Sequence, residues 1–346
     1  MKEIAHCQKQ FTEFHDAIKL TEENQILAEK RDIIINRIKD KIPDEAKDYT
    51  TFNQGSYAMH TGIKPLDENY DIDLGLYFKM SKEDVKPVEA KQWILDAVTG
   101  HTNDVKMKTP CITVSYQAGY HVDITVYASE NSDGKVYLAK GRPGSAEENK
   151  KWDESNPKDL IKTIRDHFDN ENDRKQFRRI IRYLKRWKDI QFKNTTYGKP
   201  TGIALTACAY HHMYVKKEIV DIMQSKVEYR DLDALTTLVS NILDQFRTVS
   251  VIEDDSVVYY PKITVDLPVA PYPDLFEKMS LKQMKTFKKE LESLLECLLD
   301  AKAEADPTDA AEILKKAFGD DFPVPPRKDT GKKAAALALI PSSESA

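Results

Sequence analysis

Apolar and polar positions alternate, in part, in two short stretches of the chain, residues 69–78 and 121–127. Both stretches are rich in Ile, Val, Tyr and Phe, the residue types that favour β-strands. Strand signals continue between about 74 and 140, and a helix is expected near 83–98. The run Asn131-Ser132-Asp133-Gly134 predicts a turn, and residues 141–157 predict a polar loop. The middle of the chain is therefore expected to form a sheet.

Helical spacing of apolar residues dominates the rest of the chain. Residues 5–42 read as helical, with Thr21 as an N-cap and Leu27, Ile34 and Ile38 toward one face. From Pro157 onward the pattern is mostly helical. An amphipathic helix is expected over 281–305, with these residues on its apolar face: Leu281, Met284, Phe287, Leu291, Leu294 and Leu298. The pattern predicts an α+β (or α/β) fold, in which a mixed sheet backed by helices is followed by a helical domain.

Three segments follow from this pattern. We expect a first domain over residues 1–190, ending in a long helix, and a helical domain over 191–326. Residues 327–346 follow Pro325-Pro326 and turn to Lys, Ala and Ser, so they predict a flexible tail.

Composition narrows the class of protein. The chain has 346 residues, 40% of them hydrophobic, and its 52 basic and 57 acidic residues give a net charge of −5. This balance argues against a protein that coats nucleic acid, so no stable nucleic-acid partner is expected, although it leaves room for a local basic patch. No apolar run approaches the roughly 20 residues of a membrane span, and no signal-peptide pattern is seen. The four cysteines lack zinc-ligand spacing, and a cytoplasmic protein is expected.

Three aspartates form the first candidate site. Asp71 and Asp73 are two apart in one predicted strand and therefore share a face, while Asp123 lies within the other predicted strand. A lone Asp-x-Asp is usually a solvated strand end, but an unpaired carboxylate between Val122 and Ile124 would be expensive to bury. Three converging carboxylates would suit two Mg²⁺ ions, because magnesium prefers hard oxygen ligands.

A basic helix over residues 172–188 is the second candidate. Such a run is usually only a solvated helix face, but this one carries an apolar stripe of Ile180, Leu184 and Trp187. Lys185 lies beside that stripe. A lysine at the edge of a packed face can reach into a cleft and meet a triphosphate.

The order of these motifs resembles a known superfamily. Gly55-Ser56-Tyr57, Thr61, Asp71-Ile72-Asp73 and Asp123 are similar to the motifs of the DNA polymerase β nucleotidyltransferases, and most similar to bacterial relatives of cyclic GMP-AMP synthase. The resemblance extends to the helix from Arg182 to Trp187. It extends more weakly to Thr201-Gly202-Ile203-Ala204-Leu205 and to residues 263–269, where Leu267 separates Asp266 from Pro268 in place of an Asp-Pro pair.

The resemblance implies a polymerase-β-like catalytic domain and a set of roles. Asp71, Asp73 and Asp123 would be catalytic and would hold two Mg²⁺ ions, for which Mn²⁺ could substitute. The implied nucleotide-binding residues are Gln54, Gly55, Ser56, Tyr57, Lys185, Thr201 and Asp266, with Tyr120 and Tyr197 as further stacking candidates. His60 and His121 are expected to pack or to form hydrogen bonds.

The same resemblance implies an activity. The substrates would be nucleoside triphosphates, ATP or GTP or both, and a ribose hydroxyl of one would attack the α-phosphate of another with release of pyrophosphate. A second round would close a cyclic oligonucleotide, most simply a cyclic dinucleotide, as a second messenger in anti-phage signalling. An accessory protein binding the tail is also implied.

Three other interpretations stay open from the sequence. The first is a linear terminal nucleotidyltransferase acting on RNA or on protein side chains, because the same three aspartates serve those enzymes. The second is an inactive nucleotide- or RNA-sensing module of the same fold, although all three aspartates are present. The third is a regulated interaction protein whose tail engages a partner.

Overall fold

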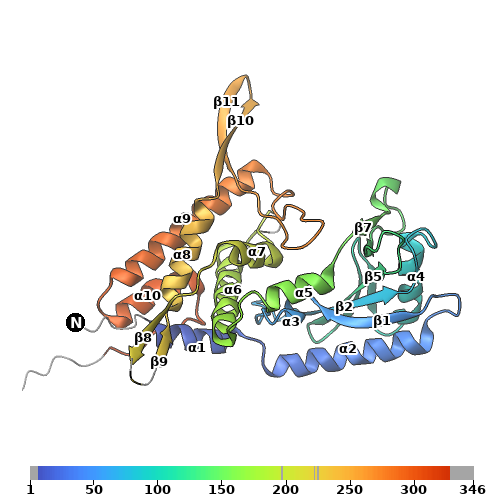
Figure 1. Cartoon of the computed structure of the whole chain (residues 1–346), viewed down its shortest axis with the longest axis horizontal. Coiled ribbons are helices and arrows are strands. Elements are labelled where there is room, and N and C mark those ends of the chain that lie inside the picture. Colours follow the sequence, from blue (N-terminus) through green and yellow to red (C-terminus); the bar gives the residue numbers. More distant parts are fainter. Residues whose placement is uncertain (1–6, 196–197, 222, 224–225, 328–346) are drawn as a thin grey trace, which may run out of the picture.

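A sheet and a bundle of helices form the two halves of the molecule, as the computed structural model in Figure 1 shows. The structure describes residues 7–195, 198–221, 223 and 226–327. The long helix α6 (Glu171–Gln191) belongs to the helical half, and α2 (Glu22–Lys41) runs along the sheet.

The sheet has seven strands and is mixed. Its main path runs β1-β2-β5-β4-β3, and β6 and β7 continue from β5. The bounds are β1 Tyr49–Gln54, β2 Tyr70–Phe78, β3 Asp104–Met107, β4 Ile112–Tyr116, β5 Tyr120–Ala128, β6 Tyr137–Ala139 and β7 Trp152–Glu154. Only the β2–β5 pair is parallel, and its register sets Asp73 opposite Asp123. The predicted strands at 69–78 and 121–127 are confirmed.

The alternation within β2 separates a core face from a polar face. Ile72, Leu74, Leu76 and Phe78 are fully buried in a cluster with residues of α2 and of α4 (Pro87–Val98). Each such side chain contributes about 1.5–3 kcal/mol when it leaves water. Register slips are therefore costly, and Asp71 and Asp73 are held on the opposite face.

The helical half is built around a second buried cluster. It contains α1 (Gln8–Ile18), α5 (Pro157–Arg165), α6, α7 (Gly202–His212), α8 (Asp231–Leu243), α9 (Leu281–Ala303) and α10 (Pro307–Phe318). Phe11 and Phe14 of α1 pack against Phe318 and Phe322 at the other end of the chain, with ring centroids 5.1–6.0 Å apart. The first helix thus packs with the last ones. The domain boundaries at 190 and 326 stay predictions, and residues 328–346 lie outside the described residues.

The predicted helix over 281–305 is confirmed as α9. Ser280 caps it by accepting from the backbone N–H of Gln283, whose side chain accepts from Ser280 in return. The predicted helical run 5–42 is two helices, because Lys19 is extended and bridges Ile63. Thr21 occupies the N-cap position of α2 without a side-chain capping bond.

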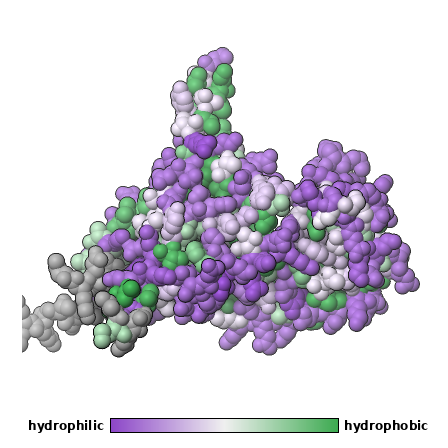
Figure 2. All heavy atoms as spheres, in the orientation of Figure 1, coloured by the Kyte–Doolittle hydropathy of each residue, from purple (hydrophilic) through white to green (hydrophobic). Residues whose placement is uncertain are grey.

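The mostly helical prediction after Pro157 misses two hairpins. They are β8 (Lys217–Asp221) with β9 (Lys226–Tyr229), and β10 (Arg247–Glu253) with β11 (Ser256–Lys262). The second hairpin turns at Asp254-Asp255, both at positive φ, between two runs rich in β-branched residues. It projects from the molecule, and hydrophobic residues lie along it (Figures 1 and 2).

The predicted turn, polar loop and absence of a membrane span can also be compared with the structure. The turn at 131–134 is confirmed by a hydrogen bond from the Gly134 N–H to the Asn131 carbonyl. The predicted polar loop 141–157 also holds a 3₁₀ turn (Glu147–Asn149) and the short strand β7. Among the helices that the structure describes, none is both long and apolar enough to span a bilayer.

Candidate active site

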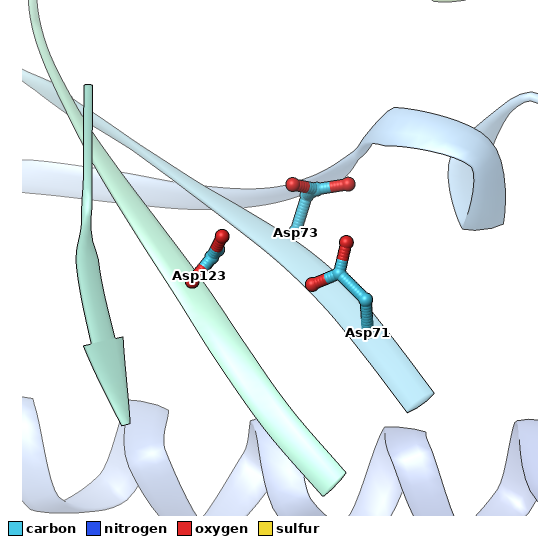
Figure 3. Close-up of side chains that lie close together, drawn as sticks. All are labelled: Asp71, Asp73 and Asp123. Carbon is cyan, nitrogen blue, oxygen red and sulfur yellow. The ribbon is translucent and has the colours of Figure 1, made fainter. Parts of the chain in front are cut away.

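Three carboxylates meet on the polar face of the sheet. Asp71 and Asp73 come from β2 and Asp123 from the adjacent β5, and Figure 3 shows the three side chains gathered above these two strands. Each offers one oxygen within 4.8 Å of the other two. The predicted convergence of the three residues follows directly from the side-chain period of two and from the parallel register.

The electrostatics of the three carboxylates are unfavourable without a cation. Burial raises the pKa of Asp73 to about 8, and the Asp71 carboxylate adds to the shift. Burial and the Asp123 carboxylate raise the pKa of Asp71 to about 6. Oxygen donors that repel one another in this way suit a hard divalent cation such as Mg²⁺, so the residues present fit the expected metal.

Three neighbours of the aspartates were not predicted as site residues. The Thr113 hydroxyl donates to Asp123, and the Lys108 ammonium lies 3.8 Å from the same carboxylate. His121 Nε2 is 3.4 Å from an oxygen of Asp71, a polar contact of the kind expected for that histidine. Thr113 and Asp123 face each other across β4 and β5, so only the strand register reveals the first contact.

The Gly-Ser turn lies directly against the aspartates. Gln54 ends β1 opposite Asp73, and Gly55 follows with φ +64° at the start of α3 (Gly55–Ala58). A Cβ atom built on Gly55 would be 1.7 Å from an Asp73 carboxylate oxygen. Glycine is therefore required both by the backbone conformation and by the closeness of the carboxylate.

Both polar ends of the Gln54 side chain form hydrogen bonds within the protein. Its Nε2 donates to Thr125 Oγ1 at 2.8 Å, and its Oε1 accepts from the Tyr127 hydroxyl at 2.9 Å. Both ends of the buried carboxamide are thus used to hold the end of β1. Gln54 lies where a nucleotide-binding residue was expected, and its contacts are those of a positioning residue for the Gly55-Ser56 turn.

Lys185 approaches the aspartates from the helical half. Its ammonium is buried and donates to the Thr61 carbonyl at 3.0 Å and to the Thr61 hydroxyl at 3.1 Å. Burial lowers the pKa of Lys185 to about 7, with Lys188 and Arg182 adding to the shift and Asp73 opposing it. A bound polyphosphate would favour the charged form of this lysine.

One cavity of about 560 Å³ joins these groups, a size typical of small-molecule sites. Of the predicted residues, its lining includes Gln54, Gly55, Ser56, Asp71, Asp73 and Lys185. The lining also includes residues that were not predicted as site residues, among them Asn69, Tyr70, Asn156, Leu160, Ile161, Gly202, Thr206 and Leu267.

Four predicted residues do not line the cavity. One is Asp123, although its carboxylate lies beside those of Asp71 and Asp73. Thr201 caps α7 through a bond from the Ala204 N–H, and its neighbour Gly202 faces the cavity instead. Asp266 is exposed and its carbonyl accepts from His211, whereas Leu267 reaches the cavity. Tyr57 packs beside the sheet cluster.

Tyr120 and Tyr197 are the other tyrosines predicted as candidates for stacking on a base. Tyr120 stacks on Tyr70, with ring centroids 5.0 Å apart and planes 18° from parallel. Through this contact it supports an aromatic ring that does line the cavity. Tyr197 lies outside the described residues.

The fold and the three carboxylates resemble those of one class of proteins, the nucleotidyltransferase domains of the polymerase β type. Residues 50–127 match the model of one family in particular, described as the nucleotidyltransferase domain of cyclic GMP-AMP synthase, DncV-like. A cyclic GMP-AMP synthase of Escherichia albertii is 27% identical over 222 residues, which cover 61% of this chain and 48% of that protein. The chain thus spans about half the length of the curated relative it matches.

Solved structures extend the likeness over most of the chain. The cyclic AMP-GMP synthase DncV of Vibrio cholerae superposes with a TM-score of 0.65 at 18% identity, covering 92% of this chain and 97% of that one. CdnG of Bradyrhizobium diazoefficiens, solved with GTP, gives 0.65 at 16% identity, covering 90% and 95%. CdnC of E. coli MS115-1, solved with ATP, gives 0.65 at 17%, covering 91% and 98%. The resemblance to bacterial cyclic GMP-AMP synthase-like nucleotidyltransferases, and the fold it implies, are confirmed.

Proposed function

We propose that this protein is a cyclic oligonucleotide synthase that joins nucleoside triphosphates by attack of a ribose hydroxyl on an α-phosphate, with release of pyrophosphate. The observation that carries the proposal is that Asp71, Asp73, the Gly55-Ser56 turn and Lys185 line one cavity, with the Asp123 carboxylate beside the two other aspartates. Carboxylates, a close backbone turn and a buried lysine are the three elements needed to hold a triphosphate whose charge is partly neutralised by metal.

The aspartates would hold the divalent ions, Mg²⁺ or Mn²⁺, with Asp123 nearest the attacking hydroxyl. Bound ions would stabilise the charge that develops on the attacking and leaving oxygens. Asp123 would also help to take up the proton of the hydroxyl. Lys108, 3.8 Å from Asp123, would offset part of the negative charge that the three carboxylates bring together.

The donor triphosphate would lie between the Gly55-Ser56 turn and Lys185. Gly55 has no side chain to obstruct phosphate oxygens, and Ser56 lines the cavity. Lys185 would exchange its bonds to Thr61 for phosphate oxygens. Thr201 and Asp266 lie beside the lining residues Gly202 and Leu267, so their part in binding would be to shape the backbone at those positions.

ATP and GTP are the proposed substrates, and a cyclic dinucleotide the simplest product. The support comes from the relatives, since the curated one is a cyclic GMP-AMP synthase and solved neighbours hold GTP or ATP. A cytoplasmic role in anti-phage signalling, with an accessory protein that binds the tail, completes the proposal.

The test is incubation of the protein with all four labelled triphosphates and Mg²⁺ or Mn²⁺, followed by phosphatase and mass spectrometry. We expect a phosphatase-resistant product without a free end. A linear product would instead favour a terminal transferase, and no product with either metal would favour a sensing module.

Variants connect the product to the site. Asp71→Asn and Asp73→Asn should each lower turnover by about a thousandfold or more, because a metal ligand that stabilises the transition state is lost. Asp48→Asn, whose side chain is 85% exposed and distant from the three aspartates, is the matched control and should keep full turnover. Near-normal turnover in both site variants would contradict the assignment.

A further inference from the structure

A second cavity, of about 630 Å³, lies outside the candidate active site. We call it the α6–β9 cavity, because α1 and α6 form one side and β9 the other. Its lining consists of Gln8, Thr12, His15, His60, Lys175, Arg178, Arg179, Arg182, Val227, Glu228 and Tyr229. Four cations therefore face one carboxylate, in a protein whose net charge is −5.

The cations differ in how far they are already neutralised. Arg179 is paired with the fully buried Asp231 through bonds of 2.6 and 2.8 Å, so it is structural. Arg178 has one longer contact, 3.5 Å, to Glu171. Lys175 is exposed and makes no ion pair with any residue that the structure describes. Arg178 and Lys175 are thus available to a ligand.

The charged guanidinium of Arg182 forms its hydrogen bonds with neutral groups. It donates to the carbonyls of Gly62 and His60, at 3.0 and 2.6 Å, and lies 2.9 Å from His15 Nε2. Burial lowers the pKa of His15 to about 4, with Arg182 contributing, so this histidine is neutral near pH 7. The positive charge of Arg182 therefore stays uncompensated beside the cavity.

Helical spacing gathers these charges on one side of α6. Lys175, Arg178 and Arg182 are three, four and seven residues apart, so they share a face. Like charges on one helix face repel, and a bound anion would relieve the repulsion that the contact of Arg178 with Glu171 leaves. The cavity volume is that of a small-molecule site, and Tyr229 offers an aromatic wall.

We propose that the α6–β9 cavity binds a small polyphosphorylated anion, at a site separate from the nucleotide cavity. Lys175 and Arg178 contact its phosphate groups, and Arg182 supplies charge from the floor of the site. Guanidinium groups suit phosphate because their N–H groups donate in pairs to its oxygens.

The segment 60–62 links this site to the candidate active site. Arg182 holds the carbonyls of residues 60 and 62, whereas Lys185, one turn along α6, holds Thr61 between them. The Thr61 N–H in turn donates to the Ser56 carbonyl at 2.9 Å. An anion that attracts the Arg182 guanidinium would therefore change its bonds to segment 60–62, and this segment also contacts the Gly55-Ser56 turn.

The test is calorimetric binding of inorganic tripolyphosphate to the full chain with EDTA present. Without metal the three aspartates repel this probe from the nucleotide cavity. We expect saturable binding to the wild type that weakens with salt. Lys175→Glu combined with Arg178→Glu should weaken it by about tenfold or more, because two phosphate contacts become repulsive.

Matched variants separate this site from the other sources of binding. Lys285→Glu with Lys288→Glu reverses two lysines of α9, of which Lys288 pairs with Glu292, and binding should be unchanged. Lys185→Ala should also keep binding. Thermal unfolding checks that each variant is folded. If the double variant fails to fold, the single variant Lys175→Gln, at an exposed position, replaces it and should show a smaller but clear loss of tripolyphosphate binding.

Three outcomes would overturn the proposal. Equal weakening by both charge reversals would mean non-specific attraction. Loss of binding only in Lys185→Ala would place the probe in the nucleotide cavity. No saturable binding of tripolyphosphate, with duplex RNA bound through Lys175 and Arg178, would mean an extended nucleic-acid surface.

Discussion

Individual residues of the candidate site are constrained by contacts that motif matching does not reveal. Gly55 lies under the Asp73 carboxylate, Gln54 is fixed by Thr125 and Tyr127, and Lys185 is fixed by Thr61. Each of these contacts is made before a substrate arrives. The site is therefore held in place by the protein itself, as efficient charge stabilisation requires.

Gly55→Ala tests the closest of these contacts. The added Cβ would overlap the Asp73 carboxylate, and alanine at φ +64° is strained by about 1 kcal/mol or more. We expect activity to fall by about a hundredfold or more with a modest loss of melting temperature. Gly134→Ala, at a turn with open space around it, carries the same backbone strain and should keep activity. Equal activities of the two variants would refute the steric argument.

Asp73→Asn tests the repulsion among the carboxylates. The pKa of Asp73 is raised in the folded protein. Between the ordinary pKa of an aspartate and this raised value, the folded chain therefore keeps a proton that the unfolded chain has released. In metal-free buffer, wild-type stability should fall as the pH rises from about 4 through about 8, and the variant should lose less, because only the raised pKa of Asp71 still contributes. Its melting temperature should exceed that of the wild type by several degrees near pH 9, and hardly at all near pH 4.

Magnesium supplies the control for that measurement. Added Mg²⁺ should raise the melting temperature of the wild type most at high pH, because it replaces the lost protons, and should raise that of Asp73→Asn far less. A variant that is no more stable at any pH would show that burial and the neighbouring carboxylates do not raise the pKa of Asp73 in the folded protein.

At the scale of elements, one buried lysine joins a helix to two loops. Lys91 of α4 is fully buried, and its ammonium donates to the carbonyls of Lys108, Thr109 and Gly141 at 2.5, 2.9 and 2.6 Å. It thereby fixes the β3–β4 turn that carries Lys108 next to Asp123.

Lys91→Met should destabilise the protein by about 2–4 kcal/mol, because three buried carbonyls lose their donor while the methionine fills similar space. Chemical denaturation measures the change. Lys79→Met, at a side chain 53% exposed, should leave stability within about 0.5 kcal/mol. An unchanged midpoint for Lys91→Met would mean that water replaces the ammonium.

The same elements show how far sequence reasoning reaches. The three aspartates converge as expected, because strand periodicity and pairing are local rules that Ile72 and Leu74 enforce by their burial. Lys91 and Thr113 could not be found in this way, since their partners lie in other elements and depend on the sheet register. The β10–β11 hairpin was missed because its strands lie between long helices, although Asp254-Asp255 is a recognisable turn.

Across the whole molecule, the two ends of the described chain close one core. Phe318 ends α10 and Phe322 follows it, and both pack on Phe11 and Phe14 of the first helix. The chain between them forms the sheet and the cavity. The stability of the candidate active site thus depends on residues far from it in sequence.

A pair of truncations tests this arrangement. A chain ending after Arg327 loses only a polar, alanine-rich segment and should keep full activity in vitro. A chain ending after Asp306 also loses α10 and both aromatic residues, and should lose most of its cooperative unfolding and activity. Activity measured beside circular dichroism distinguishes the cases. Collapse of the first truncation with unchanged folding would mean that the last residues reach the nucleotide cavity.

Because titratable groups are buried in the candidate site, binding of a ligand there should be accompanied by exchange of protons with the buffer. Asp73, with a pKa of about 8, would have to release its proton to take the proposed metal ion, whereas Lys185, with a pKa of about 7, would gain one on meeting phosphate. The two exchanges have opposite signs, and the first is the larger near pH 7. Binding heats of metal and nucleotide should therefore depend on the ionisation enthalpy of the buffer, and an unbuffered solution should acidify as the site fills.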